Sequence, residues 1–80
     1  MTLIDRVAAI FEKVFGIEAG AFSLDLTPED VLRWDSLGHM SLVMDLEDAF
    51  GVHFEVDEIT EMSSARKVVE ILQAKNAKAD

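Results

Sequence analysis

The residues best suited to chemistry in this sequence lie in the run Arg33-Trp34-Asp35-Ser36-Leu37, where an irregular polar stretch meets a long helical pattern. A serine in the first turn of a helix lies beside free backbone N–H groups and the positive end of the helix dipole, which favour an attached phosphate. The sequence therefore predicts that Ser36 is a site of covalent modification. The alternative is that Asp35 or Ser36 serves only as an N-cap.

Acidic residues surround this serine and dominate the middle of the chain. The net charge is −9 over 80 residues, and the window from Asp25 to Glu61 holds eleven acids against Arg33 alone, a net −10. Such a field repels nucleic acid and anionic membranes and attracts partners with basic patches. The alternative is that these acids form only a solvated, solubilising surface.

Length and composition limit the classes of protein to consider. Eighty residues, half of them apolar, are enough for one small core but not for a large substrate cleft, so we do not expect an enzyme. The absence of cysteine excludes a disulfide framework, a thiolate metal site and a cysteine nucleophile. Because we find neither a signal-peptide pattern nor an apolar stretch of membrane-spanning length, we expect a soluble, cytoplasmic protein. We also expect a monomer.

Hydrophobic periodicity predicts an all-α fold of four helices with a long first loop and a short third helix, in a single domain over residues 1–80. Thr2 and Asp5 resemble a capping box for a first helix that ends before Gly16. A second helix is predicted over residues 36–50, followed by a glycine that ends it.

The remaining elements are shorter. Asp57 is expected to cap a short helical turn through Met62, and Ser63 or Ser64 is expected to cap the last helix. The tail 76–80 is expected to fray. The long loop between the first two helices contains a predicted single turn, Thr27-Pro28-Glu29-Asp30, and should be held down by apolar residues tucked under the helices: Leu24, Leu26, Val31 and Leu32.

The apolar residues of the predicted second helix fall into two arcs when successive residues are turned by about 100°. One arc is expected to face the core: His39, Leu42, Val43, Leu46, Ala49 and Phe50. One small helix has little need of two buried faces, so the other arc, with its neighbouring acids, is predicted to contact partner proteins. We call this set the docking stripe: Leu37, Met40, Met44, Glu47 and Asp48. The alternative is that Met40 or Met44 packs under the long loop.

Three stretches carry a resemblance to a known family: Trp34-Asp35-Ser36-Leu37, the helix end 46–52, and the turn Asp57-Glu58-Ile59. Together they are similar to the acyl carrier protein family over nearly the whole chain, and this resemblance implies a four-helix bundle of the acyl-carrier type. The resemblance implies that a holo-carrier synthase, a phosphopantetheinyl transferase, attaches 4′-phosphopantetheine from coenzyme A to Ser36. Acyl groups would then travel as thioesters on this arm between loading and transfer enzymes. Asp35 would orient the serine or help to position the synthase's metal, with no metal site of the carrier's own.

The sequence also departs from the commonest fatty-acid carriers. Trp34 stands where those proteins usually have a small residue, and Gly38-His39 replaces the expected acidic and hydroxyl residues. Gly38 is expected to loosen the first helical turn or to permit close approach of a partner or the arm. A specialised pathway, such as polyketide, polysaccharide or aminoacyl (including D-alanyl) biosynthesis, is therefore as compatible as fatty-acid biosynthesis. By the same resemblance, the core would shelter short or medium acyl chains.

Three other functions compete with this interpretation. One is a serine hydrolase that uses His39 or His53, but the sequence shows neither a nucleophile elbow nor an oxyanion loop. Another is a calcium module, but the sequence has no twelve-residue loop with alternating acids and a central glycine, which such a module requires. A carrier-like adaptor without the arm would dock partners through its acidic surface, and its binding would be indifferent to Ser36→Ala.

Overall fold

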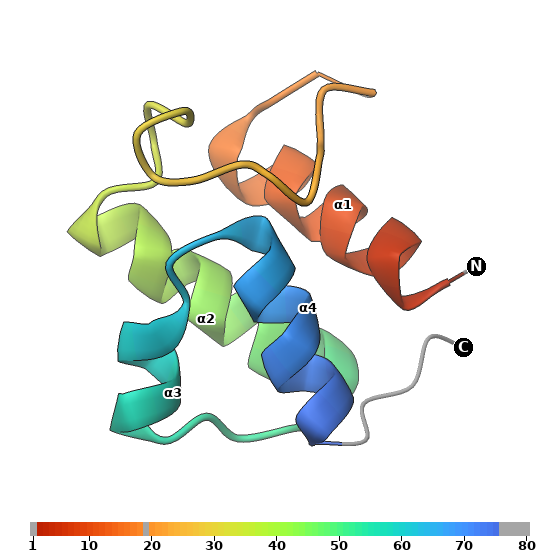
Figure 1. The fold of residues 1–80 in the computed structure, drawn as a ribbon, viewed down its shortest axis with the longest axis vertical. Helices are drawn as coiled ribbons and strands as arrows, with labels where there is room; N and C mark the ends of the chain where they lie inside the picture. Colours follow the sequence, from red (N-terminus) through yellow and green to blue (C-terminus); the bar gives the residue numbers. More distant parts are fainter. Residues whose placement is uncertain (1, 19, 76–80) are drawn as a thin grey trace.

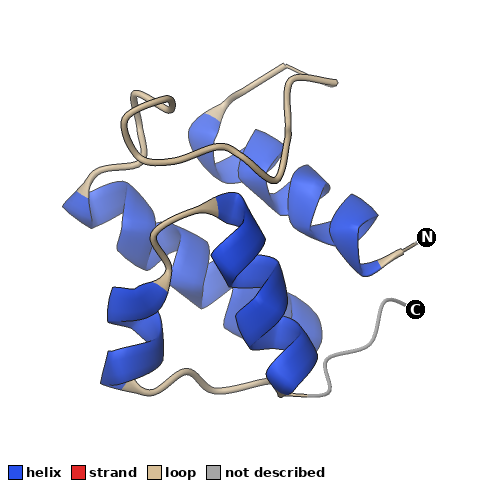
Figure 2. Ribbon diagram, in the orientation of Figure 1, coloured by secondary structure: helices blue, strands red, loops and turns tan. Residues whose placement is uncertain are grey.

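The computed structural model describes residues 2–18 and 20–75, which form four helices and no strand (Figures 1 and 2). The helices are α1 (Leu3–Phe15), α2 (Ser36–Phe50), α3 (Val56–Glu61) and α4 (Ala65–Ala74). The all-α prediction is confirmed, as are the long first loop and the short third helix. Among the described residues, no helix has the length and apolarity needed to cross a membrane. The predicted fraying of 76–80 falls outside the described residues.

The first two helices begin and end where the sequence predicts. Thr2 Oγ1 accepts a hydrogen bond from the Asp5 backbone N–H at 3.1 Å, and Asp5 Oδ2 accepts one from the Thr2 N–H at 3.2 Å. Gly16 and Gly51 follow α1 and α2 with φ of 68° and 63°. A residue with a Cβ is strained in this left-handed conformation, so glycine is the residue that ends a helix this way most easily.

The predicted cap of the third helix is wrong. Glu55, not Asp57, precedes α3 with an extended backbone, and its N–H donates to Glu58 Oε1 at 2.8 Å. Asp57 instead lies in the first turn, where a carboxylate interacts favourably with the positive end of the helix dipole. For α4 the cap is Ser64, whose hydroxyl oxygen accepts from the Lys67 N–H at 3.1 Å.

The core lies between α1, α2 and α4, and an aromatic cluster forms its end beneath the first loop. The Phe11 ring makes edge-to-face contacts with Phe15, Phe22 and Trp34, at centroid distances of 5.4, 5.1 and 5.2 Å. Trp34 also stacks on Phe15 at 5.6 Å. Such pairs contribute about 0.5–1.5 kcal/mol each beyond the burial of their area. Trp34, the residue that departs from the common carriers, is therefore part of the core.

The long loop crosses one end of the molecule and is tied to α4 (Figure 1). The backbone N–H groups of Ala65 and Arg66 donate to the carbonyls of Leu26 and Leu24, each at 2.9 Å. These N–H groups belong to the first turn of α4, which has no partners for them within the helix. The Arg66 guanidinium also pairs with Asp25 at 2.9 Å. The last helix therefore holds the first loop in place.

Three of the four loop residues predicted to tuck inward do so. Val31 is buried and Leu24 and Leu26 are half-buried, but Leu32 is 97% exposed, so its predicted burial is wrong. The backbone N–H of Trp34 donates to the Val31 carbonyl at 3.0 Å, which closes a turn. This turn directs its two end residues into the core and the leucine between them outward.

The predicted turn at Thr27–Asp30 is present. Asp30 Oδ2 accepts hydrogen bonds from both the N–H and the hydroxyl of Thr27, each at 3.1 Å.

In α2, the predicted burial of Ala49 is wrong, because this residue is exposed. Its carbonyl accepts a hydrogen bond from the Arg6 guanidinium at 2.8 Å, and the same guanidinium lies over the Phe50 ring at 4.4 Å. A cation from α1 thus covers the end of α2.

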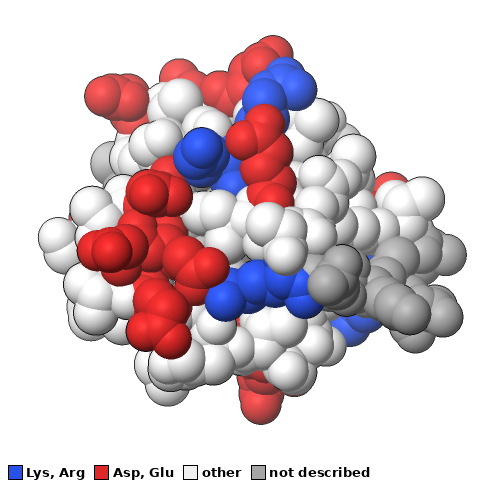
Figure 3. Space-filling model, turned by 60° about the horizontal axis from the view of Figure 1, so that its bottom comes forward, with Lys and Arg blue, Asp and Glu red and all other residues white. Residues whose placement is uncertain are grey.

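Acidic side chains gather on the side of the molecule where Figure 1 places α3 (Figure 3). Lys75 extends from the end of α4 toward this side. Its Nζ lies 2.9 Å from Glu58 Oε1 and 5.6 Å from the centre of the Phe54 ring. The hydrogen bond from the backbone N–H of Glu55 is the main cause that holds the pKa of Glu58 below its usual value. The hydrogen bond from Lys75 lowers this pKa further. Glu58 is therefore a link between α3 and α4.

We expect Glu58→Gln to remove a stabilising contribution that depends on pH. Because the folded pKa of Glu58 is lowered, this contribution is complete above the unfolded pKa of about 4.3 and is lost as the pH falls through the folded pKa. Urea unfolding should show the parent to be more stable than Glu58→Gln near neutral pH, with the difference vanishing in acid. Glu61→Gln, on the same helix, is the control. A difference that stays constant down to low pH would contradict the assignment.

Candidate functional site around Ser36

Ser36 is the first residue of α2, and its neighbour Asp35 is the N-cap. Asp35 has an extended backbone, and its Oδ1 accepts a hydrogen bond from the Gly38 N–H at 2.8 Å. The helix is therefore capped without the serine. Ser36 is exposed at the positive end of the helix dipole, and the first turn of α2 contains no acidic residue.

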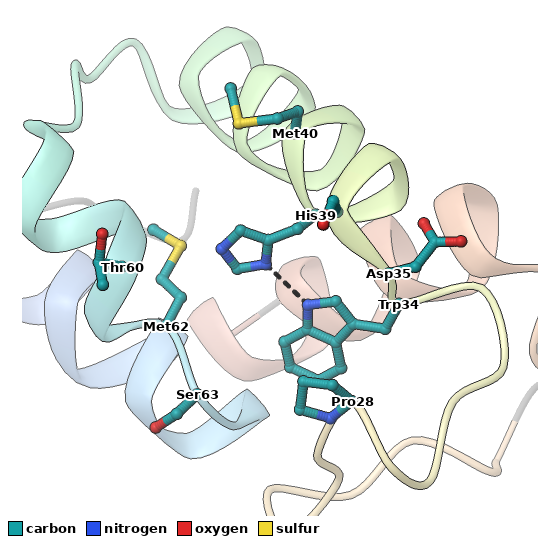
Figure 4. A pocket seen from close by; sticks show the side chains of 9 residues that line it. Pro28, Trp34, Asp35, His39, Met40, Thr60, Met62 and Ser63 are labelled. Carbon is teal, nitrogen blue, oxygen red and sulfur yellow. Dashed lines mark hydrogen bonds between the residues drawn. The ribbon is translucent and has the colours of Figure 1, made fainter.

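A groove of about 540 Å³ lies beside Ser36, between the start of α2, the first loop and the end of α3 (Figure 4). The imidazole of His39 projects into it between Trp34 and Met62 (Figure 4). Its lining combines apolar and polar side chains: Pro28, Trp34, Asp35, Ser36, His39, Met40, Thr60, Met62 and Ser63. The groove is open to solvent along its length.

His39 joins the loop to α3 through both of its ring nitrogens. Trp34 Nε1 donates to His39 Nδ1 at 2.8 Å, and His39 Nε2 lies 2.9 Å from the Ile59 carbonyl oxygen. Since Nδ1 accepts, the ring proton belongs on Nε2, which donates to the carbonyl. The two rings stack with 14° between their planes. We call this arrangement of Trp34, His39 and the Ile59 carbonyl the clasp.

The clasp answers the question of a serine–histidine pair. Both nitrogens of His39 are engaged with groups other than Ser36, so this imidazole is not placed as a base for the serine. His53 is exposed after the end of α2, with Nδ1 3.4 Å from Glu47 Oε2. The geometry therefore argues against a hydrolase. No cluster of three or more metal-binding side chains occurs in the part of the chain that the structure describes.

The three apolar residues of the docking stripe are on the surface. Leu37, Met40 and Met44 are 81%, 46% and 65% exposed, so neither methionine packs under the loop. Asp48 is exposed as well. Glu47, by contrast, is half-buried, and its Oε2 accepts a hydrogen bond from the Phe54 backbone N–H at 2.9 Å. This acid therefore has a structural role at the end of α2 that the sequence analysis missed.

Gly38 is required by the chain's own loop. A Cβ at this position would collide with the carbonyl oxygen of Arg33 and lie 3.2 Å from Phe15 Cε1. The expected loosening of the first turn is not what the structure shows, since Asp35 bonds this residue's N–H. The close approach is made by the first loop, and it brings Trp34 into the core next to the start of α2.

Comparisons with known proteins agree with this geometry. A family model described as "Phosphopantetheine attachment site" matches residues 5–72. An acyl carrier protein of Exiguobacterium sibiricum is 39% identical over 71 residues, 89% of each chain. One from Lactobacillus johnsonii is 28% identical over 72 residues, 90% of each chain. A holo acyl carrier protein from Geobacter metallireducens, solved by NMR, superposes with a TM-score of 0.83 at 25% identity, covering 95% of this chain and 87% of that one.

This chain belongs to the acyl carrier protein family. Its domain is of the kind that bears a covalently attached 4′-phosphopantetheine prosthetic group. The chain is therefore a carrier, and carriers of this family interact with a synthase and with biosynthetic enzymes.

We expect Gly38→Ala to destabilise the fold. The new methyl group must displace the Arg33 backbone, and overpacking of this kind costs about 1–3 kcal/mol, against about 1 kcal/mol gained in helix propensity. Chemical denaturation should show a lower free energy of unfolding. Ser41→Ala, at an exposed position in the same helix, is the control. A Gly38→Ala variant that is more stable than the parent would contradict the predicted collision.

Proposed function

We propose that Ser36 carries the 4′-phosphopantetheine arm and that the chain shuttles acyl intermediates on it as thioesters. The observation that carries this proposal is the exposed hydroxyl of Ser36 at the first position of α2, with Asp35 providing the cap. Two other serines are less suitable, because the Ser64 oxygen caps α4 and the Ser23 oxygen accepts from the Asp25 N–H at 3.0 Å. Asp35 supports the site by fixing the start of the helix.

The surroundings of Ser36 fit the group. Its phosphate would lie at the positive end of the α2 dipole, and the Asp35 carboxylate at this end is bonded to the Gly38 N–H. The groove beside the serine offers Met40 and Trp34 to apolar parts of the arm and the Thr60 and Ser63 side chains to its amides. When bound, the group supplies the thiol that forms a thioester, which this chain, without cysteine, cannot supply itself.

We propose that the docking stripe is the surface that partner enzymes bind. Leu37, Met40 and Met44 form an exposed apolar row on α2, and a hollow of about 390 Å³ is lined by Met44 with the acids Asp45, Glu47 and Asp48. A small apolar surface surrounded by acids suits weak, fast binding to enzymes with basic patches. These partners are a holo-carrier synthase and the enzymes that load and receive the acyl group.

Several expectations from the sequence stay predictions. They are the single carrier domain over residues 1–80, the monomeric state, the cytoplasmic location and the absence of catalytic activity. Fatty-acid, polyketide and aminoacyl biosynthesis stay alternatives for the pathway.

The attachment site is tested by mass. The parent chain and Ser36→Ala are each incubated with coenzyme A, magnesium and a broad-specificity phosphopantetheinyl transferase. We expect the parent to gain one phosphopantetheine and the variant none, with Ser41→Ala, at an exposed position of the same helix, behaving as the parent. Addition to Ser36→Ala would refute the assignment. No addition to a folded parent would favour the adaptor without an arm.

The docking stripe is tested with Met44→Glu. Because Met44 is exposed, the added charge should leave the helix intact while disrupting the apolar contact with a partner. We expect kcat/KM for arm transfer by the holo-carrier synthase to fall about tenfold or more, with an unchanged circular dichroism spectrum. Val56→Glu, at another exposed apolar position, should leave transfer unaffected. Equal losses in both variants would show that charge alone, not the stripe, is responsible.

A further inference from the structure

We propose that the clasp closes the interior of this carrier to its acyl group, so that the cargo lies in the open groove and is short or polar. This inference rests on the proposed attachment at Ser36. It opposes the expectation, drawn from the resemblance, that the core shelters short or medium acyl chains.

The direct route from Ser36 into the core passes between α2 and α3. Ser36, His39 and Met40 line the α2 side of the groove, and Thr60 lines the α3 side. The inner wall consists of Trp34 and Met62, which are only 3% and 2% exposed although they line the groove. An acyl chain that entered the core here would have to pass His39 and displace one of these two side chains.

The clasp resists that displacement. His39 spans the route, bonded to Trp34 of the loop at 2.8 Å and to the Ile59 carbonyl of α3 at 2.9 Å. Separating α2 from α3 would break the bond to Ile59, and moving the indole would leave a partly buried N–H without its acceptor, which is unfavourable. The indole is also held from behind by Phe11 and Phe15, at 5.2 and 5.6 Å.

The consequence for cargo follows from the hydrophobic effect. An acyl group confined to an open groove keeps much of its surface in water, so each added methylene contributes little free energy of burial. Groups that are short, or that bear hydroxyl or amino groups, lose nothing by this exposure. The polar lining of the groove near its α3 side, Thr60 and Ser63, is compatible with such groups.

The single tryptophan provides the test, because its indole N–H gives one NMR signal that reports the clasp directly. The chain is loaded with octanoyl-phosphopantetheine or with unacylated phosphopantetheine from the corresponding coenzyme A derivatives, and attachment is verified by intact mass. The indole signal shows whether the clasp is formed. We expect the methyl signals of Val43, Leu46 and Leu72, which lie in the core, to be the same in both forms of the parent. In His39→Ala, the octanoyl form should shift these signals relative to its own unacylated form.

His53→Ala is the matched control and should behave as the parent. Should His39→Ala fail to fold, Trp34→Phe removes the N–H bond while keeping a smaller ring in the core, and the methyl signals then give the readout. Octanoyl-dependent shifts of the core methyls in the parent would overturn the proposal. So would the absence of such shifts in the folded clasp variant, because another barrier would then exclude the chain. No added mass on the parent would instead refute attachment at Ser36, and with it the premise.

Discussion

The burial of Trp34 is the constraint on which the arrangement around Ser36 depends. Its indole contacts two phenylalanines of α1 and bonds to His39 of α2, so one side chain joins the loop to two helices. With Trp34 directed inward, Asp35 is left to cap α2 and Ser36 is left exposed at its first position. The position of Ser36 is therefore set by Trp34, which lies two residues earlier and is only 3% exposed.

Much of the fold follows from local rules that the sequence carries. The capping box at Thr2, the glycines after α1 and α2 and the serine before α4 each act within a few residues, so their effects can be predicted without knowledge of the tertiary structure. The cap of α3 was less accessible. Asp57 has the residue type that favours a cap, but Glu55 has the extended backbone and the bond to Glu58, and only the course of the chain decides between them.

The site was predictable only in part. The position of Ser36 at the start of a helix and the exposed arc of α2 could be read from spacing. The clasp could not, because Trp34 and His39 are five residues apart on either side of a helix start, and the group that accepts from His39 is a backbone carbonyl twenty residues further on. Leu32 was misplaced for a similar reason, since apolar character suggests burial but a turn directs this residue outward. Gly38 was noticed as unusual, yet its reason is a contact across the loop.

The bonds from the start of α4 to the first loop have a consequence for the order in which the molecule is completed. Two carbonyls near residue 25 are held by N–H groups about forty residues later in the chain. During synthesis, the loop and α2 leave the ribosome well before those donors exist, and domains form as units once their distant contacts become available. A transferase that recognises the folded loop would therefore act on a finished chain and pass over a nascent one.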